Sequence, residues 1–303
     1  MRKVTSLFPS ATEIVFAIGA GEQLVGVSHD CDHPPEAAER KAVTKQRFDS
    51  EGLTSAEIYR QKVEVNKKFG SVYRLDETAL WGLMSNVIIT QGPSDFSLVS
   101  LPGIRAIAEG LNPRPELVIL YPRHLDDVFD DFSKVGFAVG CLPETRALID
   151  QMNERIVAVE EGSSGKRQPR VAFVQWLDPS FSGGYWIPQM IGIAGGIDVL
   201  NTAGLSPSRF EWNQLRAYDP DIVVIACEDL SIDRVRWEVE ILFDRPGWKE
   251  LSAVKWRRVY IGNSGCFTRS GPRLIDGLEA LGWAFNPDRF SRPSHSVLQL
   301  LYD

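Results

Sequence analysis

Short apolar runs alternate with amphipathic segments along most of this chain. The apolar runs are rich in β-branched residues and predict strands at 3–8, 24–28, 72–75, 87–90, 117–120, 170–174, 222–226 and 258–261. Segments with helical periodicity or helix-terminal residues lie at 12–20, 55–68, 76–84, 126–139 and 143–161. Because strand and helix follow each other in turn, the pattern predicts an α/β fold with parallel sheets and helices on both faces.

Residues that favour helix ends mark two of these helices. Ser10 or Thr12 is in position to cap the first helix, and Gly19 stands where it would end. Asp76 is the expected N-cap of the helix at 76–84.

The middle of the chain departs from this alternation. Two helical segments follow each other there without a strand, and the run Gly162-Ser163-Ser164-Gly165 then interrupts the pattern. Strands and helices alternate again from Arg170 onwards. We therefore expect two doubly wound, Rossmann-like lobes joined by a single long backbone helix: an N-terminal lobe at 1–125, connecting helices at 126–165 and a C-terminal lobe at 166–303.

Composition narrows the class of partner. The chain has 303 residues and a formal net charge of -7, which argues against a surface for nucleic acid or for an anionic membrane. No apolar run approaches the roughly 18 residues of a membrane-spanning helix. No leader precedes the first strand, so we expect a cytoplasmic protein as the sequence stands and a periplasmic one if a signal peptide was removed. The four widely separated cysteines favour reduced thiols.

A polar loop follows the second predicted strand. It contains His29, Asp30, Asp32 and His33, and Pro34-Pro35 ends it. His29 and His33 are candidate metal ligands, but the prolines exclude a helical pair of histidines and a closed zinc site would need more ligands, so we expect no metal. A polar loop at the carboxyl end of a strand remains a suitable place for a ligand.

Aromatic side chains gather in the segment from Gln175 to Pro188. Trp176, Phe181 and Trp186 lie in this turn-rich stretch, and Trp212 and Phe267 lie in two later loops. One interpretation is a wall for a large, flat, apolar ligand; the other is that these rings only pack the sheet against the helix that follows.

Recognisable catalytic motifs are missing from the sequence. There is no GxGxxG after a strand, no P-loop and no GxSxG, which favours a binding protein without a required cofactor over an enzyme. Two alternatives stay open. One is a cytosolic enzyme on the same fold that acts on a small metabolite through the 29–33 loop. The other is a binder of a siderophore, haem or a metal chelate, with basic candidates at Arg47, Arg74, Arg123 and Arg269.

Four segments together resemble a known family. LFPSATEIVFAIGAG, GVSHDCDHPP, DPSFSGGYWIPQMIGIAGG and RSGPRLIDGLEAL resemble the cobalamin-binding substrate-binding proteins of ABC importers, whose relatives carry siderophores, haem and metal ions. Within this family the chain is similar to a subgroup without signal peptides. The resemblance implies a non-catalytic protein that holds a corrinoid such as cobalamin between two lobes. It implies ligand contacts by Pro9, Ser10, His29, Asp30, Asp32, Trp176, Phe181, Trp186, Trp212 and Phe267.

The resemblance also implies a membrane partner. Importer proteins of this kind dock on their ABC-importer membrane subunit through one surface glutamate in each lobe. Glu77 matches the first; Asn213 stands at the second, with Glu211 close by, and an asparagine lacks the charge that an ion pair with arginine needs. We therefore expect docking through Glu77 and Glu211, or else a cytosolic carrier role. We expect a monomer with a small-molecule ligand and no nucleic-acid partner.

Overall fold

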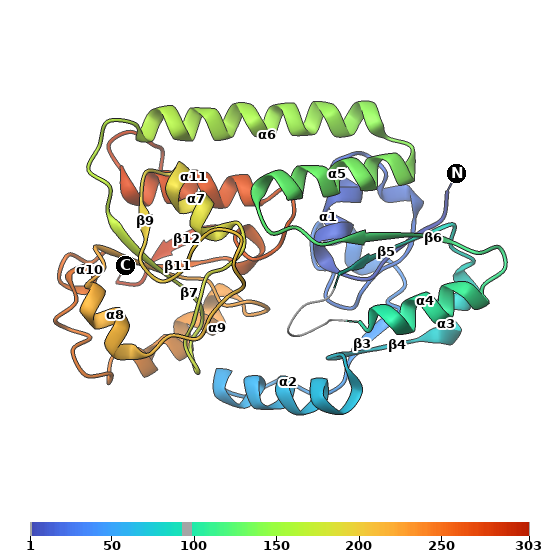
Figure 1. Cartoon of the computed structure of the whole chain (residues 1–303), viewed down its shortest axis with the longest axis horizontal. Coiled ribbons are helices and arrows are strands. Elements are labelled where there is room, and N and C mark those ends of the chain that lie inside the picture. Colours follow the sequence, from blue (N-terminus) through green and yellow to red (C-terminus); the bar gives the residue numbers. More distant parts are fainter. Residues whose placement is uncertain (1, 93–98, 303) are drawn as a thin grey trace. The chain divides into compact units, whose positions relative to one another are not determined.

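In the computed structural model, which describes residues 2–92 and 99–302, the chain divides into two units. The described residues of 1–53, 57–122 and 126–150 form unit 1, and those of 54–56, 123–125 and 151–303 form unit 2. Helix α6 (Leu142–Ser163) begins in unit 1 and ends in unit 2 (Figure 1). A separate connecting segment at 126–165 stays a prediction, because the two units share its helices.

The core of unit 1 is a parallel sheet. Its strand order is β2 (Leu24–Gly26), β1 (Val4–Ser6), β5 (Val87–Gln91) and β6 (Glu116–Leu120), and every pair in it is parallel. The predicted α/β class is confirmed here. The strand order changes direction between β1 and β5, and open α/β sheets bind ligands beyond the carboxyl ends of the strands at such a point.

Helices cover this sheet, and a small antiparallel pair adjoins it. The pair consists of β3 (Thr44–Gln46) and β4 (Tyr73–Leu75), of which only β4 was predicted. Buried Leu80 and Ile104 pack with Ile88 of the sheet in one core cluster. The helices that lie wholly or mostly in unit 1 are α1 (Pro9–Ala17), α2 (Ser55–Phe69), α3 (Glu77–Leu83), α4 (Leu101–Gly110) and α5 (Leu125–Val139), with 3₁₀ turns at Gly21–Gln23 and Pro35–Glu39. The first residues of α2 and α5 belong to unit 2.

The first helix starts earlier than predicted and without a side-chain cap. Phe8 is its N-cap, Pro9 is its first residue, and Ser10 and Thr12 lie buried inside it, so the prediction that Ser10 or Thr12 caps it was wrong. Proline at the first position has a preset φ and no N–H to satisfy, which reduces the need for a cap. Gly19, with φ of 75°, follows its last turn as predicted.

The N-cap of α3 gives a stability prediction. The Asp76 carboxylate accepts a 2.9 Å hydrogen bond from the Ala79 N–H, as expected for a cap. We expect Asp76→Ala to lower the free energy of unfolding by about 1 kcal/mol in urea titrations, because that N–H loses its partner. Asp76→Asn should keep most of the stability, since asparagine caps equally well. Equal losses in both variants would contradict the capping role.

Unit 2 is built on a second, larger sheet. Its strand order is β12 (Leu298–Leu300), β11 (Val259–Gly262), β10 (Ile222–Ile225), β7 (Arg170–Trp176) and β8 (Phe181–Ser182), with β9 (Ile197–Asp198) also paired to β7. The strands β7, β10 and β11 are parallel as predicted, whereas β8 and β12 join antiparallel.

Ion pairs hold the second half of α6 against α11 within unit 2. Arg155 donates to Glu279 at 2.8 Å and to Asp276 at 2.7 Å, and these carboxylates raise the pKa of Arg155 further above its ordinary value. No helix in the described ranges has the length and apolar character needed to cross a membrane. The helices of unit 2 are α7 (Ile187–Ile193), α8 (Trp212–Tyr218), α9 (Ile232–Glu238), α10 (Ser252–Lys255) and α11 (Leu274–Phe285), with 3₁₀ turns at Val239–Leu242 and Ser264–Cys266.

Candidate functional site

Five predicted ligand residues belong to unit 1 and follow its first two strands. Pro9 and Ser10 come directly after β1, and His29, Asp30 and Asp32 come after β2. These strands are neighbours and parallel, so their carboxyl ends lie at the same edge of the sheet. The structure therefore brings the two segments to one edge, beside the change in strand direction.

A polar network orients His29 and Asp30. Thr44 Oγ1 lies 2.7 Å from His29 Nδ1 and accepts a 3.0 Å hydrogen bond from the His29 backbone N–H. His29 Nε2 lies 3.4 Å from Asp30 Oδ1, and the Tyr73 hydroxyl donates to Asp30 Oδ2. The Tyr73 ring meets the imidazole edge-on at 4.6 Å. Two polar side chains are thus held in place, which reduces the entropy a ligand must remove on binding.

Sequence reasoning missed two members of this network, Thr44 and Tyr73. They come from β3 and β4, whose antiparallel register pairs Thr44 with Leu75 and Gln46 with Tyr73. The strand around Tyr73 was predicted, but nothing in the polar run Thr44-Lys45-Gln46 indicates a strand. Only the pairing brings Thr44 to His29.

The remaining unit 1 candidates differ in exposure. Pro9 and Ser10 are buried at the start of α1, whereas Asp32 is exposed and His33 half-buried. Thr12 Oγ1 lies 3.0 Å from Cys31 Sγ and so attaches the 29–33 loop to α1. His29, Asp30 and Asp32 are the candidates here that present polar atoms near the surface.

A metal site needs several ligating side chains close together, and the described residues can be compared with this requirement. Within residues 2–92 and 99–302, no group of three or more His, Cys, Asp or Glu side chains could hold a metal ion. His29 instead bonds to Thr44 through Nδ1. All four cysteines carry free thiols, and burial raises the pKa of Cys227 strongly.

A hollow of about 520 Å³ lies in unit 1 along α2. Its lining comes from one segment, between Leu53 and Glu64, and includes Glu57, Arg60 and Gln61. None of the predicted ligand residues lines this hollow, so we do not assign the corrinoid to it.

In unit 2, Trp176 and Phe181 lie at the carboxyl end of strand β7. Trp176 ends β7 and pairs with Phe181 at the start of β8. The Trp176 indole is 7% exposed, and its N–H donates to the carbonyl oxygens of Ser55 at 3.2 Å and Asp178 at 3.1 Å. β7 lies beside β10, where strand order changes direction, so both aromatics stand at the second position that favours a ligand.

Trp186 and Phe267 are core residues of unit 2. The Phe267 side chain is fully buried and its ring lies 5.5 Å from that of Phe173. Trp186 is 6% exposed and donates its indole N–H to the Phe267 carbonyl oxygen at 2.8 Å. For these two residues the geometry favours the packing interpretation over a ligand wall. Phe181 and Trp212 stay half-buried.

Backbone contacts hold the loop that carries Trp186. A Cβ atom on Gly184 would lie 2.3 Å from the Pro207 nitrogen, so only glycine allows this approach. The Tyr185 N–H donates to Leu205 O at 2.6 Å, and Asn201 Nδ2 donates to Gly183 O at 2.8 Å. We name residues 183–185 with 201–207 the loop clasp.

Asp198 supports the same loops from below the surface. Its carboxylate accepts backbone hydrogen bonds from Leu200 at 2.8 Å and Asn201 at 3.1 Å. Burial nevertheless raises the pKa of Asp198 to about 6, because removal from water costs more than these bonds return.

The predicted docking residues are all exposed. Glu77 lies in the first turn of α3 in unit 1, and Glu211 is the N-cap of α8 in unit 2. The Glu211 N–H donates to Gln214 Oε1 at 2.8 Å in a capping box, and Asn213 accepts from Arg216 at 3.4 Å. Trp212 donates its indole N–H to Pro246 O at 2.7 Å and packs beside Trp248.

The chain thus consists of two α/β units built on parallel strands, and in each unit candidate residues lie at the carboxyl ends of the strands. Residues 107–264 match the family described as "Periplasmic binding protein". The chain belongs to this family, and it is a solute-binding protein rather than an enzyme.

Curated relatives support the assignment. The chain is 22% identical over 300 residues to the uncharacterized ABC transporter substrate-binding lipoprotein YvrC of Bacillus subtilis, an alignment that covers 95% of this chain and 81% of that protein. It is 21% identical over 284 residues to a vitamin B12-binding protein of Vibrio cholerae, covering 91% and 86%.

Solved structures share the fold. A periplasmic heme binding protein from Pseudomonas aeruginosa superposes with a TM-score of 0.70 at 21% identity, covering 98% of this chain and 96% of that one. The periplasmic vitamin B12 binding protein BtuF of Vibrio cholerae gives a TM-score of 0.66 at 18% identity, covering 94% and 97%. The resemblance read from the sequence is therefore confirmed at the level of family and fold.

Proposed function

We propose that this protein is the substrate-binding component of an ABC importer and that its ligand is a corrinoid of the cobalamin type. The ligand class is supported by the kind of side chain that each unit, taken by itself, has at the carboxyl ends of its strands. Unit 1 supplies the ordered polar pair His29 and Asp30, and unit 2 supplies half-buried Phe181 beside Trp176. A corrin has a broad apolar face and amide groups around its rim, which suit aromatic and polar contacts respectively.

The remaining predicted contacts enter this proposal with unequal support. Asp32 and Trp212 have surface to offer, whereas Pro9, Ser10, Trp186 and Phe267 are buried in their own units. We therefore propose that the buried residues support the binding surface and that His29, Asp30, Asp32, Phe181 and Trp212 touch the ligand.

The names of the relatives support a proposal for the compartment and for the protein partner. One relative is named a lipoprotein of an ABC transporter and several structures are named periplasmic. These names favour a protein that works outside the cytoplasmic membrane with an importer, with exposed Glu77 and Glu211 as the proposed docking residues. They do not favour the cytosolic carrier. The monomeric state stays a prediction.

A spectral titration tests the ligand. We expect cobalamin or cobinamide to shift its corrin absorbance on mixing with the purified protein at micromolar concentration. His29→Gln should weaken binding about tenfold, the equivalent of about 1.4 kcal/mol for one lost polar contact. His295→Gln, a change at an exposed histidine of unit 2, should leave the affinity unchanged. No absorbance change with either corrinoid would contradict the proposal.

Haem is the second candidate ligand, since fold relatives are named for it at a similar TM-score. The same titration with haemin separates the two. A Soret shift with haemin, together with no response to either corrinoid, would replace the corrinoid by haem. A response only to a ferric chelate would support a siderophore or another metal chelate as the ligand.

A further inference from the structure

A basic and aromatic strip lies at the edge of the unit 2 sheet where its parallel strands begin, opposite the edge that carries Trp176. Three segments form it: 166–170 before and at the start of β7, 218–221 before β10, and 252–258 before β11. We name these residues the entry edge. The strands they precede are neighbours in the order β11, β10, β7, so the three segments lie side by side.

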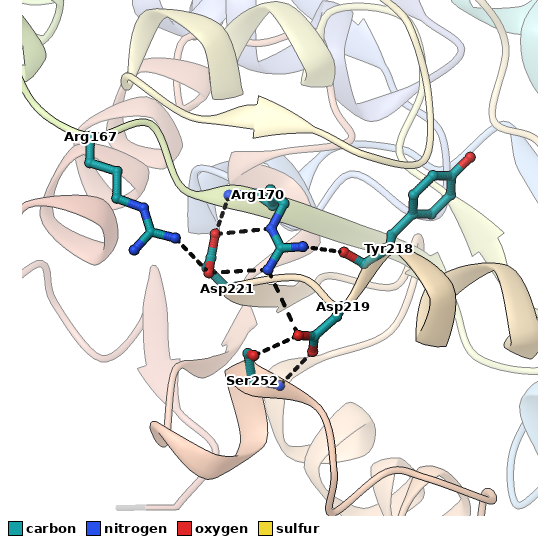
Figure 2. Close-up of polar contacts among 6 residues, drawn as sticks. All are labelled: Arg167, Arg170, Tyr218, Asp219, Asp221 and Ser252. Carbon is teal, nitrogen blue, oxygen red and sulfur yellow. Dashed lines mark hydrogen bonds and ion pairs between the residues drawn. The ribbon is translucent and has the colours of Figure 1, made fainter.

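Hydrogen bonds and ion pairs tie the entry edge together, as Figure 2 shows. Arg170 donates to the Tyr218 carbonyl oxygen at 2.8 Å and pairs with Asp219 at 3.8 Å. Asp219 accepts from the Ser252 N–H at 2.8 Å and from its hydroxyl at 2.7 Å. Asp221 accepts from the Arg170 N–H at 2.8 Å. This network of hydrogen bonds and ion pairs holds the three segments in a fixed arrangement.

The charge of the entry edge is opposite to that of the chain. Its sequence contains Lys166, Arg167, Arg170, Lys255, Arg257 and Arg258, against the carboxylates Asp219 and Asp221, in a chain of net charge -7. Both carboxylates accept hydrogen bonds within this network, whereas Lys166, Lys255 and Arg257 are exposed. Salt at 0.1 M screens charges that are more than about 10 Å apart. An anionic surface in contact with this edge therefore experiences the local positive charge rather than the net negative charge of the chain.

Apolar side chains project from the same strip. Trp256 is 76% exposed, the highest value among the large hydrophobic residues of the described ranges, and Lys255 and Arg257 flank it. Tyr218 is 47% exposed. Tryptophan and tyrosine between cations are typical of side chains that rest in the interface of a lipid bilayer, where the ring meets the headgroups and the cations meet lipid phosphate.

We propose that the entry edge is a peripheral membrane-contact surface for a bilayer rich in anionic phospholipid. Charge complementarity selects this occupant, and the exposed indole distinguishes it from a purely electrostatic partner. The proposal does not depend on the identity of the ligand bound at the opposite edge. The net charge of -7 disfavours an anionic membrane for the chain as a whole, whereas this surface reverses the charge locally.

Vesicle binding by the full chain tests the proposal. We expect sedimentation with vesicles of phosphatidylcholine and phosphatidylglycerol, much weaker sedimentation with phosphatidylcholine alone, and loss of binding at high salt. Lys166→Glu combined with Lys255→Glu should lower partitioning at least about tenfold. Lys67→Glu combined with Lys68→Glu makes the same change in net charge at the exposed end of α2 and should have little effect.

The indole has its own readout. Brominated phosphatidylglycerol should quench part of the tryptophan fluorescence, and Trp256→Ala should remove most of that quenching although seven of the 8 tryptophans remain. Trp237→Ala, at a 62% exposed residue of α9, should not. Equal effects of the edge and control variants, absence of sedimentation, or binding to duplex DNA without binding to vesicles would overturn the proposal.

Discussion

Replacing Phe267 by alanine is expected to lower the free energy of unfolding by about 3–5 kcal/mol, the cost of a large cavity in a close-packed core. The Phe267 ring is fully buried, with Phe173 at 5.5 Å and with Gly262 and Gly277 so near that a Cβ on either would lie within 3.1 Å of it. Its neighbours are backbone and sheet residues, which can collapse into the void only partly.

Thermal and urea unfolding measure this effect. The result is informative because the resemblance to importer proteins implies that Phe267 contacts the ligand, whereas the structure places it in the core. A core role predicts a loss of stability that is present without any ligand. Trp256→Ala, at an exposed ring of the same unit, should change the free energy of unfolding by no more than about 0.5 kcal/mol. If Phe267→Ala left stability intact and only weakened ligand binding, the side chain would be a ligand contact and not a core residue.

Gly184→Ala is expected to lower the free energy of unfolding by about 3 kcal/mol. The added Cβ would meet the Pro207 nitrogen at 2.3 Å and the Ser206 carbonyl carbon at 2.7 Å. Both are backbone atoms of the loop clasp, so the two loops must separate, and the 2.6 Å bond from the Tyr185 N–H to Leu205 O would break. Trp186, which we propose supports the binding surface, comes directly after Tyr185 in the chain. We therefore expect any corrinoid or haem affinity to fall as well.

A matched glycine lies a few residues further along. Gly192, in α7, is exposed, and a Cβ added to it would meet no atom within 4 Å. Gly192→Ala should therefore stabilise the protein by about 0.5–1 kcal/mol, the helix preference of alanine over glycine. Differential scanning calorimetry of both variants gives the comparison. A Gly184→Ala protein as stable as the parent would show that the clasp is loose.

Much of the fold was predictable because its parallel strands are continuous apolar runs. Segments such as Val87–Gln91 and Ile222–Ile225 are buried on both faces of their sheets. Such strands appear in the sequence as continuous apolar runs, which can be recognised without knowing which strand they pair with. The short strands escaped prediction for the opposite reason. Thr44–Gln46 and Leu298–Leu300 become strands only through their pairing with β4 and β11.

The candidate site was predictable only as a set of loops. His29 and Asp30 follow β2, as predicted, whereas Trp176 is the last residue of β7 and does not lie in the loop after it. Whether an aromatic in such a loop faces solvent or core depends on side-chain packing, which spacing does not encode. Phe267 lies in the core because the Gly262 and Gly277 backbones leave room for its ring. Trp186 is buried with its indole N–H bonded to the Phe267 carbonyl oxygen.

By itself the sequence determined the α/β class, the family and the absence of recognisable catalytic motifs, since these depend on local periodicity and on motifs contiguous in the chain. Tertiary structure alone decided three things: the junction of Thr44 and Tyr73 with His29 and Asp30, the burial of Phe267, and the gathering of Lys166, Tyr218 and Trp256 at one sheet edge. Each of them joins residues far apart in the chain, and strand order, which no local pattern specifies, sets which segments become neighbours.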